Sequence, residues 1–87
     1  MHCFYIVRCA DQSLYVGQTD ALEERVRAHN LGRGPRFTQI RRPVVWAYYE
    51  NYDSRAAAMI RESQVKRWSR AKKEALVAGD LARLKKL

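Results

Sequence analysis

Four side chains in the first third of the chain combine the chemistries that an active site needs. Tyr5, Tyr15 and Arg25 follow one another at intervals of ten residues, and His29 comes one helical turn after Arg25. A phenol or an imidazole can take up or release a proton, while a guanidinium can bind two anionic oxygens at once. We therefore expect an active site where these four groups converge. Arg25 and His29 would then face a phosphate, and the alternative is that both are simply solvated, as arginine and histidine on a surface usually are.

The two tyrosines lie on separate arms of a predicted β-hairpin. The apolar runs Phe4–Cys9 and Leu14–Gly17 are rich in β-branched and aromatic residues, and the polar segment Ala10–Ser13 separates them. An even-numbered loop would place the tyrosines on opposite faces, whereas an odd loop or a bulge would place them on one face. The turn lacks an Asn-Gly pair, which favours the odd connection, so we expect Tyr5 and Tyr15 to share a face.

Arg25 and His29 belong to a predicted helix that follows the hairpin. Thr19 or Asp20 is a suitable N-cap, and the helix should end near Asn30. Residues one turn apart share a helix face, so Arg25 and His29 should lie together beside the apolar stripe that packs on the sheet.

The remainder of the chain predicts one further strand and two further helices. These are expected at Pro43–Glu50, from Asp53 or Ser54 to about Trp68, and from Arg70 to about Ala78. Residues 1–78 are therefore predicted to form one α+β domain, with residues 79–87 as a short basic tail.

The charge balance indicates the class of partner. The 87 residues include 17 Lys and Arg against nine Asp and Glu, so the formal net charge is +8. A strongly positive surface on so small a domain predicts a polyanionic partner. Nucleic acid fits better than a membrane, because the charges are spread over the chain and no segment approaches the roughly 18 to 20 apolar residues that span a bilayer.

Basic residues are especially dense in the loop that follows the first helix. Gly32–Pro35 should end that helix. The four arginines of the loop are Arg33, Arg36, Arg41 and Arg42. A basic loop beside the candidate site indicates contact with nucleic-acid phosphates, and Lys66 in the second helix is a further candidate. The alternative is a solvated charged loop without a binding role, since arginine is common on protein surfaces.

The two cysteines indicate a reducing compartment. Cys3 and Cys9 lie in the first predicted strand, where six residues of extended chain separate them by about 20 Å. This distance excludes a disulfide between them, and the spacing is not typical of a zinc site. Two reduced cysteines, with no visible secretory leader before the first strand, predict a cytoplasmic protein.

Composition and spacing alone lead to a small basic α+β domain that binds nucleic acid. The sequence has no Gly-rich phosphate loop, paired-histidine metal motif or serine nucleophile elbow. However, Tyr5-Ile6, Tyr15-Val16-Gly17, Arg25, His29 and a glutamate in the next long helix together resemble the GIY-YIG nuclease superfamily. The run His29-Asn30-Leu31-Gly32-Arg33-Gly34, with Thr38 and Arg41-Arg42-Pro43, is similar to small, single-domain bacterial members of that superfamily.

The resemblance implies both a fold and an activity. The fold would be a three-stranded antiparallel sheet flanked by helices, in the order β-β-α-β-α-α. The activity would be that of an endonuclease that hydrolyses phosphodiester bonds in DNA with one divalent metal ion, Mg²⁺ or Mn²⁺, and no small-molecule cofactor. Repair or processing of single-stranded or branched DNA is the role that suits such an enzyme.

The resemblance also implies a role for each candidate residue. Tyr15 would be the general base that activates the attacking water, and Tyr5 would position water and phosphate. Arg25 would bind the scissile phosphate, and His29 would assist at that phosphate or at the base. Glu62 would ligate the metal ion.

Glu62 has a competing interpretation from its position in the helix. Glu62 and Lys66 have the favourable i,i+4 spacing of an exposed ion pair. If Glu62 ligates a metal, we expect it instead to face a cavity bordered by Tyr5, Tyr15 and Arg25.

Two departures from the family pattern leave other functions open. Cys3-Phe4 stands where the first motif usually has Gly-Ile, and Gln18 stands where several members have a lysine that could lower the pKa of Tyr15. A non-catalytic nucleic-acid-binding module on the same fold is therefore the main alternative. An interaction partner within a larger repair assembly is a third possibility.

Overall fold

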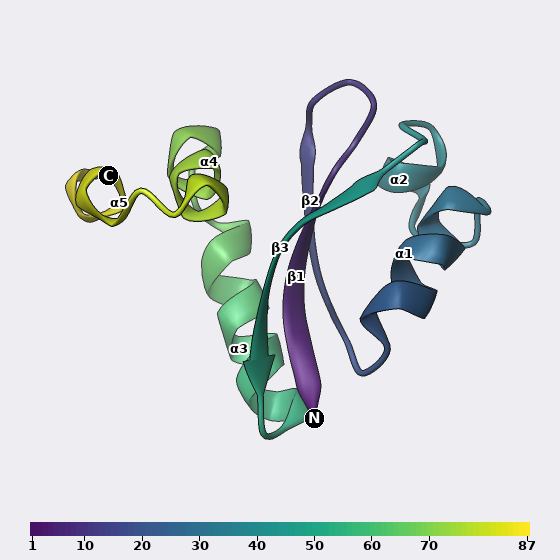
Figure 1. Ribbon diagram of the computed structural model, residues 1–87, viewed down its shortest axis with the longest axis horizontal. Coiled ribbons are helices and arrows are strands. Elements are labelled where there is room, and N and C mark those ends of the chain that lie inside the picture. The colour runs from purple at the N-terminus through teal and green to yellow at the C-terminus, as the bar shows by residue number, and fades with distance from the viewer.

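A computed structural model describes residues 1–87 as a three-stranded sheet between two groups of helices (Figure 1). In chain order, the elements are β1 (His2–Arg8), β2 (Leu14–Thr19), α1 (Leu22–Asn30), α2 (Arg36–Gln39), β3 (Val45–Tyr52), α3 (Arg55–Lys66), α4 (Arg70–Ala78) and α5 (Leu81–Lys86). The strand order is β2-β1-β3, and both pairs are antiparallel. Helices α1 and α2 lie on one side of the sheet, and α3 and α4 lie on the other (Figure 1). The expected α+β fold with a three-stranded antiparallel sheet is confirmed.

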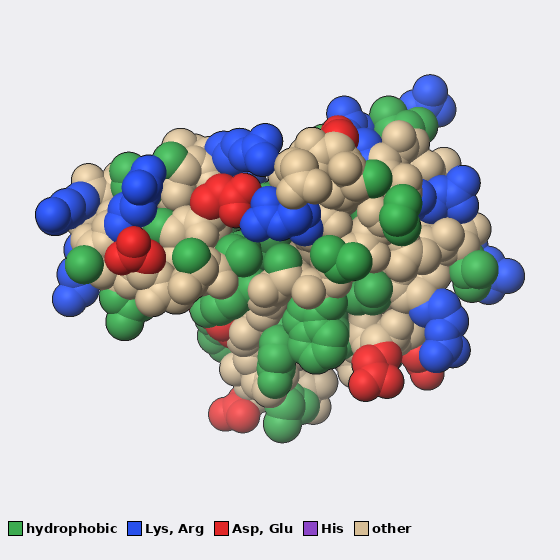
Figure 2. All heavy atoms as spheres, turned by 45° about the horizontal axis from the view of Figure 1, so that its top comes forward, with side chains coloured by type: hydrophobic (Ala, Val, Ile, Leu, Met, Phe, Trp, Pro, Cys, Tyr) green, Lys and Arg blue, Asp and Glu red, His purple; other side chains and the backbone are tan.

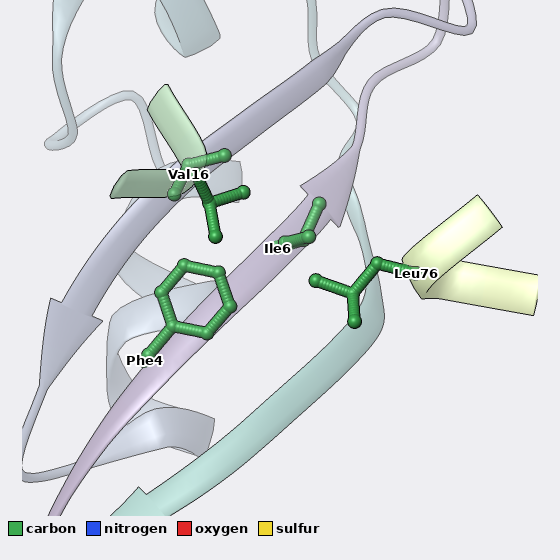
Figure 3. Packing of buried hydrophobic residues seen from close by; sticks show 5 residues of the cluster. Phe4, Ile6, Val16 and Leu76 are labelled. Carbon is green, nitrogen blue, oxygen red and sulfur yellow. The ribbon is translucent and has the colours of Figure 1, made fainter. Parts of the chain in front are cut away.

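Strand β1 is the centre of the sheet and is apolar on both faces, as expected for a strand that is covered on both sides. On the α3 side, the buried cluster consists of Phe4, Ile6, Val16, Val65 and Leu76 (Figure 3). On the α1 side, the buried cluster consists of Tyr5, Val7, Cys9 and Val44, with Leu22 and Val26 of α1 packed against it. Tyr5 is therefore a member of the core as well as a site candidate.

The hairpin has the odd connection that places both tyrosines on one face. Residues 9–13 join β1 to β2, and Gln12 has the left-handed φ of 72° that completes a short turn with a bulge. In the resulting register, Val7 lies directly opposite Tyr15. Opposed side chains point to the same face, and Val7 shares its face with Tyr5. The prediction that the two tyrosines share a face is confirmed.

Helix α1 has its N-cap one or two residues later than predicted. Its N-cap is Ala21, which has no side-chain cap, and the Thr19 hydroxyl accepts a hydrogen bond from the Ala21 N–H at 3.2 Å. The prediction of Thr19 or Asp20 as N-cap is wrong, because Thr19 is the last residue of β2 and closes the turn into the helix. The predicted end at Asn30 is confirmed. The Asn30 side chain bonds to the backbone of Val44: its Oδ1 accepts from the Val44 N–H at 2.7 Å, and its Nδ2 donates to the Val44 carbonyl at 3.0 Å.

The same contact explains why β3 starts later than expected. The sequence predicts this strand at Pro43–Glu50, but it spans Val45–Tyr52. Pro43 has no N–H to donate, and the backbone of Val44 is already bonded to Asn30, so pairing with β1 begins one residue later. The preceding basic segment is also more ordered than a loop, since it contains the short helix α2.

The caps of the C-terminal helices agree with the sequence. Ser54 and Ser69 accept hydrogen bonds from backbone N–H groups at the starts of α3 and α4, at 3.1 and 3.2 Å. Helix α3 ends at Lys66, slightly before the predicted Trp68. The segment predicted as a tail forms α5, which Asp80 caps, and Leu84 packs against the cluster on the α3 side. No helix of the structure is both long and apolar enough to cross a membrane.

A partly buried ion pair joins α3 to β3. The Glu50 carboxylate accepts hydrogen bonds from Arg61 Nε at 2.9 Å and from the hydroxyls of Tyr48 and Tyr52 at 2.6 Å each. Burial, together with the bond to Glu50, raises the pKa of Tyr48 to about 12. Tyr48 and Tyr52 therefore pack on the α3 side of the sheet.

Both cysteines are buried and have free thiols.

Candidate functional site

Tyr5 lies at the centre of the candidate site because Gly17 leaves room for its ring. The two residues are directly paired across β1 and β2. A Cβ atom on Gly17 would lie 2.6 Å from the Tyr5 hydroxyl and 2.7 Å from Cζ, which is too close for any side chain. The absence of a side chain at Gly17 therefore lets the phenol extend over β2 toward α1.

A continuous series of hydrogen bonds runs through the Tyr5 hydroxyl. Arg25 Nε donates to Tyr5 Oη at 3.3 Å, and Tyr5 Oη lies 2.8 Å from His29 Nε2. On the other side of the imidazole, His29 Nδ1 lies 2.8 Å from Thr38 Oγ1. The Thr38 hydroxyl in turn donates to the carbonyl of Pro35 at 3.0 Å. We call Arg25, Tyr5, His29, Thr38 and the Pro35 carbonyl the relay.

For a neutral imidazole, which the burial of His29 favours, the two ends of the relay determine the direction of every bond in it. A guanidinium can only donate and a carbonyl can only accept. Since the Thr38 hydroxyl donates to Pro35, it accepts from His29 Nδ1–H, and His29 Nε2 then has no proton and accepts from the Tyr5 hydroxyl. The neutral His29 ring therefore carries its proton on Nδ1, and each group in the relay has a partner.

His29 is fully buried, and its surroundings disfavour its charged form. Burial, with a smaller contribution from the Arg25 charge, lowers the pKa of His29 from 6.5 to about 4. The sequence predicted that His29 assists at the phosphate or at the base; in the structure the ring has no exposed surface and both nitrogens are bonded within the protein, so its contacts are with Tyr5 and Thr38. A Cβ on Gly34 would lie 2.5 Å from Nδ1, so this glycine makes room for the imidazole.

The two tyrosines differ in their access to solvent. Tyr5 is only 1% exposed, and burial raises the pKa of its hydroxyl against the opposing effect of Arg25. Tyr15 is partly exposed, and its hydroxyl makes no hydrogen bond within the protein. Its ring packs edge-on against His29 at 5.4 Å between centroids and lies beside Phe37 at 6.0 Å. Tyr15 is thus the tyrosine whose hydroxyl can contact water.

One guanidinium nitrogen of Arg25 is bonded to the protein, and the other two are available for a ligand. Its Nε is bonded to Tyr5, whereas neither Nη atom has a partner in the protein. Two parallel N–H groups suit the paired oxygens of a phosphate. The relay therefore supports an arginine that is oriented for an anion.

The metal-ligand role predicted a Glu62 side chain that is not paired with Lys66, but the structure shows this pair. Its Oε2 lies 3.1 Å from Lys66 Nζ, so the exposed-helix ion pair forms. The Glu62 side chain is nevertheless only 18% exposed, and it lies near enough to Tyr5 to contribute a small increase to the pKa of that hydroxyl, after burial as the main cause. The structure contains no group of three or more His, Cys, Asp or Glu side chains that could hold a metal ion.

The loop arginines divide into two kinds. Arg41 binds Asp11 at 3.1 Å and lies over the Phe37 ring, and Arg42 donates to two backbone carbonyls of its own region. By contrast, Arg33 and Arg36 are exposed and have no side-chain partner. Two of the four predicted phosphate contacts are therefore freely available, and the other two also stabilise the loop.

Gln18 lies on the other face of the sheet from the relay. It pairs with Phe4, whose side chain belongs to the cluster on the α3 side, and its amide is hydrogen-bonded to His2. A lysine at this position would project away from the face that carries Tyr15. The expectation that Gln18 removes a cation from beside Tyr15 is therefore wrong, because residues alternate between faces along β2.

The residues that sequence reasoning missed are those that support the relay. Thr38 and Gly34 appeared in the sequence only as parts of a family-like run, with no role assigned, and Gly17 appeared only as part of a motif. Their signal was the short spacing between a histidine, a glycine and a threonine. Their function depends on distances across two elements, which spacing alone does not reveal.

Comparisons with known proteins identify the family of this chain. The family model described as the GIY-YIG catalytic domain matches residues 1–75. A UPF0213 protein of Natronomonas pharaonis is 47% identical over 79 residues, covering 91% of this chain and 93% of that protein. A UPF0213 protein of Staphylococcus haemolyticus is 47% identical over 72 residues, with coverages of 83% and 88%. The solution NMR structure of a UPF0213 protein from Bacillus halodurans superposes with a TM-score of 0.58 at 38% identity, covering 88% of this chain and 82% of that one.

Proposed function

Since the chain belongs to the GIY-YIG family, we propose that it is a divalent-metal-dependent endonuclease that hydrolyses phosphodiester bonds in DNA. We further propose that it acts in the repair or processing of single-stranded or branched DNA, in the cytoplasm. The two buried free cysteines support the compartment. The observation that carries the activity is the relay, because it orients a guanidinium whose two Nη groups have no other partner.

In this proposal, Arg25 binds the scissile phosphate and Tyr5 holds Arg25 in place. The Nε–H of Arg25 is bonded to Tyr5, so the plane of the guanidinium is restricted before DNA arrives. Such preorganisation favours the transition state, where the phosphoryl oxygens carry more charge. His29 is then a positioning residue that acts through Tyr5.

Tyr15 is the proposed general base. Its partly exposed hydroxyl lies on the same face as Tyr5, where it can take a proton from a water molecule that approaches the phosphate. A phenol loses its proton near pH 10 in water, so a base role at neutral pH requires a nearby cation. The proposed role therefore requires Arg25 and a bound metal ion to stabilise the phenolate.

Glu62 is the proposed ligand of the metal ion. Mg²⁺ and Mn²⁺ prefer oxygen ligands, and Mg²⁺ sites commonly use one or two carboxylates, with water and substrate phosphate completing the shell. A single, mostly buried carboxylate therefore fits this kind of site, provided that Glu62 exchanges Lys66 for the metal. When bound, the ion would stabilise negative charge on the phosphoryl oxygens and the leaving group.

The DNA backbone is proposed to follow the exposed cations near the relay. Arg33 and Arg36 have no partner in the protein, and Lys66 has a side chain that is 55% exposed. Arg41 and Arg42 are also proposed phosphate contacts, but they are already bonded to Asp11 and to the Gln39 carbonyl, respectively. Neutralising several phosphates would make binding fall steeply with salt.

The test compares cleavage of labelled single-stranded, duplex and branched DNA, with and without Mg²⁺ or Mn²⁺. We expect metal-dependent cleavage by the wild type, at least 100-fold slower cleavage by Tyr15→Phe, and nearly unchanged DNA affinity. Tyr48→Phe is the matched control, because it removes the same hydroxyl from the other face of the sheet. Tight binding without cleavage in any metal would instead establish the non-catalytic binding module.

A further inference from the structure

Two aromatic side chains of β3 lie exposed on the face that carries the relay. Trp46 and Tyr49 are 46% and 45% exposed, and their ring centroids lie 5.1 Å apart at an angle of 63°. In the register of the sheet, Tyr49 lies opposite Tyr5 and Trp46 lies opposite Val7, so all four side chains point to the α1 side. The proposed cleavage reaction uses neither exposed ring.

The aromatic pair forms one wall of a hollow in the surface. The hollow has a volume of about 420 Å³, and it lies between the pair and the start of α1. Its lining also includes Asn51 and the acidic residues Asp20, Glu23 and Glu24. In Figure 2, hydrophobic side chains gather at the lower centre of the view, and acidic side chains lie to their right.

We propose that this hollow binds one unpaired nucleobase of the strand that is cleaved at the relay, an inference that rests on the proposed nuclease function. Exposed aromatic rings stack with the π-face of any base. The hollow is of the size that suits a small molecule and holds a single base with its sugar. Base-paired DNA cannot enter, because its bases are stacked inside the duplex.

The position of the hollow fits a strand whose phosphate is bound at Arg25. The Tyr5 ring extends over β2, and Trp46 and Tyr49 lie on β3, two interstrand spacings or about 10 Å away. A few nucleotides bridge that distance. The substrate class is therefore DNA with unpaired bases beside the scissile phosphate.

The charge of the lining predicts which bases are preferred. Carboxylates repel the phosphate backbone, so the backbone must run outside the hollow, along the basic side chains. The same carboxylates accept hydrogen bonds from exocyclic amino groups, which cytosine, adenine and guanine carry and thymine lacks. The hollow should therefore bind cytosine in preference to thymine.

Binding of short oligonucleotides in metal-free buffer tests the proposal without cleavage. The probes are a single-stranded oligodeoxycytidine, a single-stranded oligothymidine and a mixed-sequence duplex, each titrated into the full chain. We expect Trp46→Ala to bind the deoxycytidine strand about tenfold more weakly and the duplex unchanged. Trp46→Phe should retain most of the affinity. Ile60→Ala, an exposed apolar residue of α3, is the matched control and should leave all three affinities unchanged.

A second variant tests the carboxylates independently of the ring. Asp20→Asn combined with Glu23→Gln should abolish the preference for deoxycytidine over thymidine, while overall affinity rises because two negative charges are removed. Equal single-strand affinities in wild type and Trp46→Ala would overturn the base-binding proposal. If Tyr15→Phe still abolished cleavage in that case, the nuclease function would survive without it.

The hollow could also fit a cationic side chain of another protein, and the same variants separate that case. Loss of self-association or of binding to a lysine-rich peptide in Trp46→Ala, with unchanged oligonucleotide binding, would overturn the proposal in favour of a protein contact.

Discussion

His29 makes the stability of this protein depend on pH between about 4 and 6.5. The perturbation is mild acidification from pH 7 to pH 4. The pKa of His29 falls from 6.5 to about 4 on folding, because the fully buried ring is desolvated and lies near Arg25. The side chains in contact with the ring are Tyr5, Tyr15 and Thr38.

The direction and size of the effect follow from linkage. Between pH 6.5 and about 4, the unfolded chain binds a proton at His29 and the folded chain does not. Stability therefore rises with pH in this window, is fully present above pH 6.5, and is lost as pH falls toward 4. The shift corresponds to about 3 kcal/mol, with a slope of at most about 1.4 kcal/mol per pH unit.

Urea unfolding at a series of pH values measures this slope directly. His29→Leu is the comparison, because it keeps a buried side chain but cannot titrate. We expect it to be less stable than the wild type at pH 7 and to lack the slope between pH 4.5 and 6.5. The carboxylates with lowered pKa, Asp11, Glu50 and Glu74, lose their contribution at lower pH, and they should affect both proteins equally.

Nitrogen NMR of the imidazole provides the decisive readout. The expected spectrum is that of a neutral ring with its proton on Nδ1, unchanged down to pH 5. A His29 signal that titrates near 6.5, or a ring protonated on Nε2, would refute both the burial argument and the direction of the relay. The same stability slope in the wild type and in His29→Leu would refute the linkage calculation.

Three further predictions concern the residues around the relay. Thr38→Val should cost about 1 to 3 kcal/mol and slow cleavage, because it leaves His29 Nδ1–H without an acceptor, whereas Thr38→Ser should restore both in urea unfolding and cleavage assays. Gly17→Ala should displace Tyr5, destabilise the fold by about 1 to 3 kcal/mol and weaken DNA cleavage, and unchanged activity would contradict the close packing of the ring. Arg36→Gln should reduce the salt dependence of DNA binding by about one ion, while Arg41→Gln should instead lower the melting temperature, because only Arg41 is bonded to the protein.

The sequence predicted the elements well where local chemistry decides them. Ser54 and Ser69 cap their helices because hydroxyl caps need only the first turn of the helix. The start of α1 was mispredicted, since the Thr19 side chain turned out to close the turn after a strand instead of capping a helix. Similarly, β3 begins late because Asn30, fourteen residues earlier, occupies the backbone of Val44. Such contacts between distant segments have no local signature.

The candidate site shows the same division. Residue types and spacing indicated Tyr5, Tyr15, Arg25 and His29, and the structure brings these four together on one side of the sheet. The sequence did not predict that His29 is fully buried, because spacing on a helix indicates a face but not a depth. Glu62 was expected to face the site without a partner, and it is paired with Lys66.

The relay also connects the basic loop to the residue that would bind phosphate. Thr38 lies in α2, within the loop segment, and its hydroxyl is bonded to Pro35 at the start of the same segment. Any movement of this segment therefore changes the acceptor of His29, then the orientation of Tyr5, and finally that of Arg25. Because Arg41 fixes the far end of the segment to Asp11, a strand of DNA that draws Arg41 away would loosen the same support. Arginines that remain bonded to the protein thus favour a rigid site, and those without partners, Arg33 and Arg36, can bind phosphates without disturbing it.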